Sequence, residues 1–471
     1  MDERCGLKRH RAVPLVTLLV LCLSRPAGAE SHGQELSLAD CLTSALRDNP
    51  IITAAEREVD VAAAERQALS GRYLPTVSAR MLVGPTPAAH ANPNNPTVTT
   101  TPVNDYDYLV RNLGPFFRAE LTVVQPLSTF GKIDNGERAL AEAVGARQHL
   151  VDAKKWEVVT LVKTLYFGLV LTGDLLKLLD EVDGYVSQAR QYLEEHLEKD
   201  DAEVKPIDRA KLTTYEAELK MQRIEVLTRR QILIDGLSRL MGRDPEGAWS
   251  PADSELAPVT FADVPLADLT ASASANYPEL AAATRGVRAL ELKRAAMQAR
   301  YYPDLFVAGG LRYGVAPNRD VQKSPFLVDD FNFLAVGIAL GLRFDWETGV
   351  AGAEAARASA ELAALDDNRR ALFSRVQHDV LAAHAEWAAV RDKIEANKEA
   401  YKAARAWSVF AMNGFELGTV TARELIDGLS AFVKARFTLL ELNYEYNVAV
   451  ARLSQTAGRE LMPDLANVVP R

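Results

Sequence analysis

The chain consists of two similar halves. Residues 38–83 reappear at 266–311, and each copy carries two prolines that lie 25 residues apart. The copies are offset by 228 residues in this region and by 216 residues further on, where Gly242 aligns with Gly458. A solenoid repeat has only about 20–50 residues, so a duplicated unit of this length does not indicate a solenoid. The sequence predicts one architecture built from two similar halves, with the pseudo-symmetry of a larger assembly.

Residues 1–29 are predicted to be a secretory signal peptide. Four basic residues between positions 4 and 11 precede the short apolar stretch 13–23, and Ala27-Gly28-Ala29 has the small residues of a cleavage site. The apolar stretch is too short to span a membrane comfortably. We therefore expect an exported protein whose mature chain begins near Glu30.

Composition narrows the class of protein. The chain has 54 basic and 63 acidic residues, a formal net charge of −9, which argues against nucleic acid as a partner. Only Cys41 remains after the signal peptide, so we expect no disulfide within the chain, and Cys41 among leucines is expected to be buried. No long uncharged apolar run follows residue 29, so a bilayer would have to be crossed by strands rather than by a helix.

Most of the mature sequence is predicted to be helical. Two long segments, 132–200 and 350–413, are each followed by a shorter one, 206–241 and 421–457. An uninterrupted helix over the first segment would be on the order of 100 Å long. Its apolar positions step by four and three residues, as in a coiled coil. This seam comprises Val158, Val162, Leu165, Leu169, Thr172, Leu176 and Leu179.

Four short segments alternate with period two instead: 74–84, 117–123, 305–313 and 333–344. Such alternation over about 9–12 residues is typical of a strand that crosses a bilayer. Two hairpins cannot close a barrel, and an open sheet in lipid would leave its edges unpaired. If these strands cross a membrane, several chains must therefore share one barrel.

These segments divide the chain. We predict a first repeat, 30–241, with a β-hairpin at 74–127 and a helical hairpin at 132–241. A linker, 242–264, leads to a second repeat, 265–458, with a β-hairpin at 303–345 and a helical hairpin at 350–457, followed by a C-terminal tail, 459–471. The polar stretches 85–115 and 314–330 are expected to be solvent-facing loops at the outer surface.

The order and spacing of several short runs resemble a known family. They are Leu36-Ser37-Leu38, Asn49-Pro50, Leu74-Pro75, Val124-Gln125-Pro126-Leu127, Phe130-Gly131, the run from Asn413 to Thr419, and Leu425-Ile426-Asp427. Together with the duplication, they make the mature chain similar to TolC-type outer-membrane efflux proteins over essentially its whole length.

The resemblance implies a mainly α-helical fold with a small β part. Three chains would each give four strands to one transmembrane β-barrel, and their coiled-coil helices would continue it across the periplasm as an α-barrel. Members of this family are passive channels without enzymatic activity. They lie in the outer membrane and dock onto a periplasmic adaptor protein and an inner-membrane transporter, in efflux or type I secretion.

The resemblance also places candidate gate residues at the periplasmic tip. Asp208 in the first half, Glu424 and Asp427 in the second half, and the aromatic Phe415 before the turn match the positions concerned. Three copies of such carboxylates around one axis would attract cations. The alternative is that these acids are ordinary first-turn residues, favoured by the helix dipole or by the preceding proline.

Charged residues also occur on the polar faces of the predicted strands. Arg80, Arg118, Glu120 and Arg312 would point into the lumen of a barrel or lie near its rims, whereas on a soluble sheet they would be ordinary surface residues. The sequence has no metalloprotease, CxxC or phosphate-loop motif, so we expect no catalytic residue, no cofactor and no resident metal. The main alternative to a channel is a soluble periplasmic coiled-coil adaptor or scaffold, which would leave the four strands unexplained.

Overall fold

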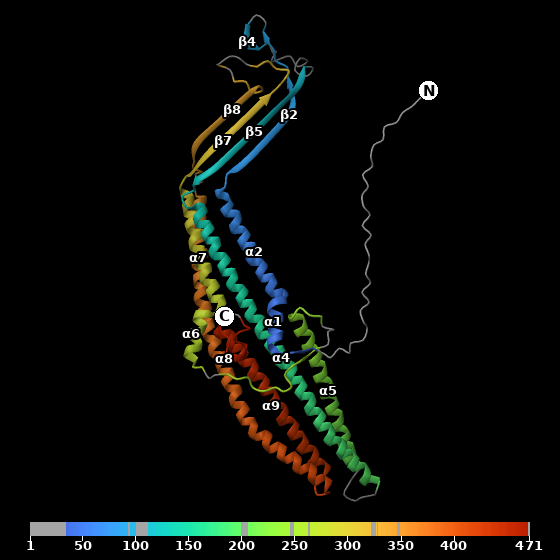
Figure 1. The fold of residues 1–471 in the computed structure, drawn as a ribbon. Helices are drawn as coiled ribbons and strands as arrows, with labels where there is room; N and C mark the ends of the chain where they lie inside the picture. Colours follow the sequence, from blue (N-terminus) through green and yellow to red (C-terminus); the bar gives the residue numbers. More distant parts are fainter. Residues whose placement is uncertain are drawn as a thin grey trace, which may run out of the picture.

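The computed structural model describes residues 34–92, 95–99, 112–198, 206–244, 249–261, 264–321, 326, 328–345 and 349–469. The predicted signal peptide, 1–29, lies outside these residues. The molecule is elongated, with a sheet at one end and long helices that run from it to a tip at the other end (Figure 1). Short segments from three parts of the chain cross the helices at mid-height.

The two halves repeat their elements with matching lengths. Each half begins with a helix of 11 residues, a helix of 21 residues and a strand of 12 residues. These are α1 Leu38–Asp48, α2 Pro50–Ser70 and β2 Thr76–Pro87 in the first half, and α6 Leu266–Asn276, α7 Pro278–Gln298 and β7 Asp304–Val315 in the second half. Proline opens both 21-residue helices, because the first helical position needs no backbone N–H.

Each half then continues into a helical hairpin. The helices α4 Lys132–Glu198 and α8 Val350–Glu416 have 67 residues each, and α5 Pro206–Leu240 and α9 Ala422–Ala457 lead back from the tip. At about 1.5 Å per residue, the two long helices are about 100 Å long. In α4 the predicted seam is buried or partly buried. One stretch of α4 is apolar and long enough to cross a membrane, but 72% of it is buried inside the protein, as expected for a core helix.

The four predicted strands form one antiparallel sheet with the order β2-β5-β7-β8, in which β5 spans Leu113–Ser128 and β8 spans Phe333–Arg343. The pair β2–β5 extends further than predicted, because Pro85 pairs with Pro115 and Pro87 with Leu113. Proline cannot donate to a ladder, but it is tolerated at an edge. β2 is an edge strand, and β5 pairs there only with β2, so the strands continue through the prolines. The predicted loop 85–115 is therefore partly strand, and it also contains the small hairpin of β3 Ala91–Asn92 and β4 Asn95–Thr99.

The chain has two distinct lateral edges. Near the sheet the helices pack in the order α2, α4, α7, α8, and towards the tip in the order α5, α4, α9, α8. One edge therefore carries β2, α2 and α5, and the opposite edge carries β8 and α8 (Figure 1). A polypeptide with two different open edges can associate head to tail.

A belt crosses the helices at mid-height. The strand β1 Gln34–Leu36 pairs in parallel with β6 Trp249–Pro251 from the linker. The linker then runs over α4 and α9, where the carboxylate of Asp174 accepts a hydrogen bond from Leu256 N at 2.7 Å and the side chain of Asn447 accepts one from Val259 N at 2.8 Å. The C-terminal tail adds buried Met462, Leu465 and Val469 to the same core, which also contains Cys41 at 0% exposure.

Candidate functional site

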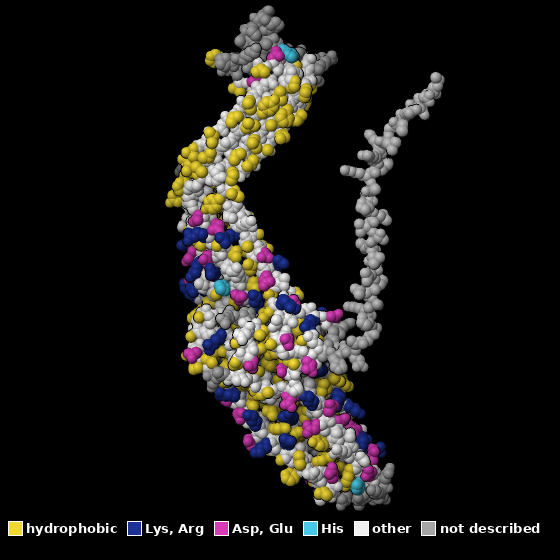
Figure 2. Space-filling model, viewed as in Figure 1, with side chains coloured by type: hydrophobic (Ala, Val, Ile, Leu, Met, Phe, Trp, Pro, Cys, Tyr) yellow, Lys and Arg dark blue, Asp and Glu magenta, His cyan; other side chains and the backbone are white. Residues whose placement is uncertain are grey.

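The sheet has two chemically different faces. The register places the odd-numbered residues of β2, β5 and β7 on one face, together with even-numbered residues of β8. This face is apolar and strongly exposed, with Ile338 at 80%, Val83 at 76% and Val336 at 74%. Apolar side chains gather over the sheet, whereas charged side chains cover the helices below it (Figure 2). An exposed apolar face of this size marks a contact with lipid or with another protein.

The opposite face carries the charged residues of the strands. Arg80 pairs in register with Glu120, and Glu120 pairs with Arg312, so the three form one row across β2, β5 and β7. Arg118 lies next to this row, and its Nη2 donates a hydrogen bond to the carbonyl oxygen of Asp330 at 2.6 Å. The structure thus brings all four predicted lumen candidates to one face, opposite the apolar one.

Aromatic side chains surround the junction between the strands and the helices. Tyr73, Phe130, Tyr301 and Tyr302 are 42–57% exposed there. The rings of Phe130 and Tyr302 stack with their centroids 6.3 Å apart. Aromatic residues gather where a membrane protein leaves the hydrocarbon region. Strands of 11 or 12 residues, which rise about 3.3 Å per residue and tilt by about 45°, match the thickness of that region.

The tip of the helices holds the candidate gate acids. Asp208 lies in the first turn of α5, where its carboxylate forms an ion pair with Lys211 at 3.0 Å and is only 14% exposed. Glu424 completes a capping box at the start of α9, because its carboxylate accepts hydrogen bonds from the backbone N–H and the hydroxyl group of Thr421. These hydrogen bonds hold the pKa of Glu424 below its ordinary value. Glu424 therefore has a local structural role, whatever it does in an assembly.

The other two tip candidates differ in exposure. The carboxylate of Asp427 is 56% exposed and lies 3.9 Å from Arg423. Phe415 is only 4% exposed, and its ring lies 4.8 Å from that of Tyr192 on α4. The structure therefore places Phe415 in the hydrophobic core of the single chain, where it joins the tips of the two helical hairpins. Tyr192 was not a sequence candidate, since nothing local distinguishes it from other tyrosines on the helix.

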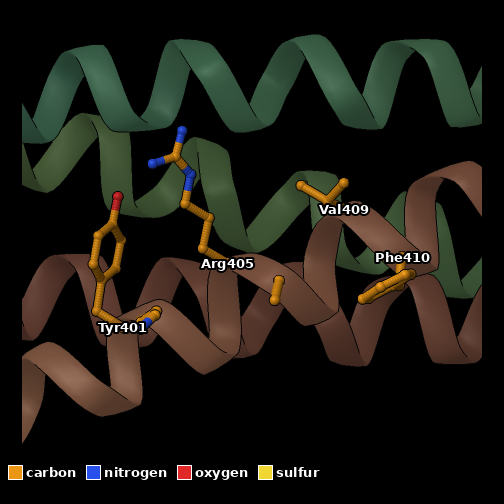
Figure 3. A pocket seen from close by; sticks show the side chains of 6 residues that line it. Tyr401, Arg405, Val409 and Phe410 are labelled. Atoms are coloured by element: carbon orange, nitrogen blue, oxygen red, sulfur yellow. The ribbon is translucent and has the colours of Figure 1, made fainter.

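A hollow of about 440 Å³ lies beside α8 near the tip. Tyr401, Arg405 and Val409 point from α8 towards the first helical hairpin, and Phe410 lies further along the same helix (Figure 3). Phe410 is 76% exposed and Trp407 is 48% exposed. This combination of aromatic and basic side chains resembles a protein contact more than a catalytic cleft. Within the described ranges, no group of three or more His, Cys, Asp or Glu side chains could hold a metal ion.

Comparison with known proteins gives a family match for most of the second half of the chain. Residues 269–459 match the model of the family described as outer membrane efflux protein. The matched stretch covers most of the second half and less than half of the whole chain. The first-half landmarks lie outside the matched range, although the duplicated elements give both halves the same local architecture. No curated protein sequence matches the chain.

Solved structures share the efflux-protein fold over nearly the whole chain. The Campylobacter jejuni CmeC outer membrane channel is 15% identical with a TM-score of 0.72, over 90% of this chain and 86% of that one. The outer membrane protein VceC from Vibrio cholerae is 14% identical with a TM-score of 0.71, over 90% and 96%. The open state of the Neisseria gonorrhoeae MtrE outer membrane channel is 15% identical with a TM-score of 0.70, over 90% and 89%.

The predicted resemblance is therefore confirmed, and so is the mainly α-helical fold with a small four-stranded sheet. The chain has the fold of outer-membrane efflux channels, and most of its second half matches the model of the outer membrane efflux protein family. The alternative of a soluble periplasmic adaptor is not favoured, because it leaves the exposed apolar face of the sheet without a partner. The roles of the individual lumen and tip residues stay predictions.

Proposed function

We propose that three copies of this chain assemble into one passive exit duct, the outer-membrane part of a tripartite efflux or type I secretion system. The observation that carries the proposal is the four-stranded sheet, which has an exposed apolar face and two open edges, β2 and β8. Hydrocarbon does not tolerate unpaired strand edges. When β8 of each copy pairs with β2 of the next, three copies give a closed barrel of twelve strands.

The helices support the same head-to-tail arrangement. On the α5 edge, Ile207, Ile224 and Ile232 are 60%, 66% and 66% exposed. On the α8 edge, Phe410 and Leu417 are 76% and 78% exposed. Apolar side chains on both edges favour packing of α8 of one copy against α5 of the next, which continues the barrel as a tube of helices. The proposed interface is heterologous and closes into a ring.

The remaining parts of the proposal concern partners and chemistry. A periplasmic adaptor protein and an inner-membrane transporter would engage the tip, while outer-membrane lipid would cover the apolar face of the sheet. Residues 1–29 would be removed on export as a signal peptide. The duct itself would catalyse no reaction, because a passive channel requires only a continuous path.

The oligomeric state of the mature protein tests the proposal. The protein would be extracted from outer membranes in mild detergent and its mass measured, with correction for bound detergent. A trimer is the expected result. A monomer, or a protein found in the soluble periplasmic fraction, would contradict the shared barrel.

We further propose that the acids at the tip form a cation-attracting entrance in the trimer. Joint replacement Glu424→Gln and Asp427→Asn should lower the preference of the channel for cations in planar bilayers. Glutamine at position 424 can retain the capping box, so helix α9 should keep its start. Unchanged selectivity would leave Glu424 with its capping role alone. Exposed Glu395 on α8, which forms a surface ion pair with Lys398 at 2.6 Å, provides a control as Glu395→Gln.

A further inference from the structure

The second charged region of the channel lies within the sheet, far from the acidic tip. Arg80 and Arg312 flank Glu120 in the row across β2, β5 and β7. Residues paired directly across antiparallel strands lie about 4.5–5.5 Å apart. All three lie inside their strands: Arg80 is four residues from the start of β2, Glu120 is seven residues from the start of β5, and Arg312 is three residues from the end of β7. A charged side chain at this depth in a membrane must face a water-filled interior.

The arginines of this row remain available to solutes. Arg80 and Arg312 are exposed, and within the described part of the chain neither forms an ion pair with a carboxylate. Arg312 lies over the ring of Phe333 at 6.0 Å, and Arg118 lies over the same ring at 5.7 Å. Phe333 thus holds two guanidinium groups on the same face as Arg80. Among the described residues, Glu120 is the one acid paired in register with this row, so it offsets only part of the positive charge.

The residues of β8 that lie beside Arg312 on this face are small. The residue of β8 paired with Arg312 is Ala335, and its neighbour on the same face is Gly337. A side chain added at Gly337 would meet no atom within 4 Å. The small residues Ala335 and Gly337 therefore leave the space beside Arg312 open.

The charges on this face do not balance. In and beside the row, three arginines and one glutamate give each chain a net charge of +2, and Arg343 and Asp304 on the same face form an ion pair at 3.3 Å that adds no net charge. The whole chain, by contrast, carries −9. In the trimer the three arginines and one glutamate become a ring of nine positive and three negative groups around one axis. Rings of arginine or lysine favour anions in pores. Protein and lipid around the barrel have a low dielectric constant, which focuses the field into the water-filled interior.

We propose that Arg80, Arg118 and Arg312 form an anion-selective zone inside the barrel, which attracts solutes that carry negative charge as they leave the cell. This inference rests on the proposed trimeric barrel. Glu120 has the opposite function, since it lowers the positive potential of the row. The channel would then have two regions of opposite charge in series, an acidic tip and a basic barrel.

Reversal potentials in planar bilayers under a potassium chloride gradient test the proposal, with chloride as the anionic probe. Arg80→Gln and Arg312→Gln should each lower the chloride-to-potassium permeability ratio, and Glu120→Gln should raise it. Three charges at about 10 Å from an ion in water change its local concentration by roughly five- to tenfold, so each variant should shift the ratio by about three- to tenfold at low salt. The shifts should shrink at 1 M salt, where the Debye length is about 3 Å. Thr122→Asn, a neutral exchange on the same face, provides the matched control and should leave the ratio unchanged.

The arginine and glutamate variants should shift the permeability ratio in opposite directions, and this distinguishes an anion-selective zone from a general disturbance of the barrel. A general disturbance of the barrel would move all variants in the same direction, and that result would overturn the anion-selective zone. Equal permeability ratios in wild type, Arg80→Gln and Glu120→Gln, with normal conductance, would overturn it too while leaving the channel intact. If the wild-type protein formed no channels at all, the shared barrel would be wrong, and the inference would be wrong with it.

Discussion

A buried ion pair fastens the C-terminal tail to the longest helix of the first half. Nζ of Lys163 on α4 lies 2.6 Å from Oε2 of Glu460, and the two side chains are 0% and 5% exposed. Burial lowers the pKa of the Lys163 ammonium, and the attraction of Glu460 offsets this effect only in part. Glu460 also accepts a hydrogen bond from Met462 N at 3.0 Å, which begins the buried part of the tail. The pair therefore connects two segments that lie 297 residues apart in sequence.

Glu460→Gln should destabilise the protein strongly, because it leaves the Lys163 ammonium buried without a carboxylate. Lys163 can avoid this by losing its proton. From an ordinary pKa of 10.5, deprotonation at pH 7 costs at most about 4–5 kcal/mol. Breaking a buried pair by removing one partner costs ~3–5 kcal/mol, which agrees with that limit. The double variant with Lys163→Met should recover most of the loss, because no buried charge remains unpaired.

The loss of stability caused by Glu460→Gln should depend on pH in a defined direction. The pKa of Lys163 is lower in the folded than in the unfolded chain, so the unfolded chain binds the additional proton between these two values, and stability rises with pH there. Removing the carboxylate lowers the folded-state pKa further. The difference between wild type and Glu460→Gln should therefore shrink as the pH rises from 7 towards 9, by up to about 1.4 kcal/mol per pH unit.

Thermal unfolding of the detergent-solubilised protein, followed by tryptophan fluorescence, measures this loss. Trypsin cleavage after Arg459 reports release of the tail independently. Glu386→Gln is the matched control, because Glu386 forms an ion pair with Arg452 at 3.7 Å in which both side chains are 60% exposed. Such a surface pair contributes at most about 1 kcal/mol. The reasoning fails if Glu460→Gln costs no more than the control, or if its cost grows with pH.

Three further substitutions or treatments test other parts of the structure. Ile338→Arg places a charge on the apolar face at a residue that is 80% exposed, and it should destabilise the membrane-inserted barrel by about 2–4 kcal/mol. Recovery of heat-resistant oligomer from outer membranes measures this effect. The control Thr122→Arg, on the opposite face, should assemble nearly normally. Burial raises the pKa of the Cys41 thiol to about 12, so maleimide at pH 8 should label the protein only after denaturation, and labelling of the folded protein would contradict the buried position. Gly458 ends α9 with a φ of 64°, and a Cβ there would lie 2.9 Å from the backbone of Asn276. Gly458→Ala should therefore lower the free energy of unfolding by about 1–3 kcal/mol. An unchanged thermal midpoint would argue against this strained geometry.

Much of the fold could be predicted because its signals are local and repeated. Alternation with period two located the four strands and separated the polar Arg80 from the apolar Met81, which lie on opposite faces of β2. The heptad seam located the long helices, since residues such as Val162 recur on one side of α4 and are buried there. Because the chain is duplicated, elements predicted in one half could be compared with those predicted in the other half. The prolines of the segment 85–115 led to a predicted end of β2 that is too early. An edge strand tolerates proline, and whether a strand lies at an edge depends on which strands pair with it.

The tertiary structure decided what no local pattern contains. The row of Arg80, Glu120 and Arg312 exists because β5 pairs with β2 on one side and with β7 from the second half on the other. Sequence periodicity assigns a residue to a face but not to a register.

The same limit explains which partners the sequence could not show for individual residues. A lysine in a helix is ordinarily expected in solvent, and only the approach of Glu460 from the tail allows Lys163 to be fully buried. Phe415 matched a tip position by sequence, but the meeting of two helical hairpins gives it Tyr192 as a partner in the core. The sequence by itself determined the main helices and strands and the polar and apolar faces of the strands, because these depend on neighbours along the chain. The tertiary structure determined which side chains meet, because packing and electrostatics act between residues that are close in space and distant in sequence.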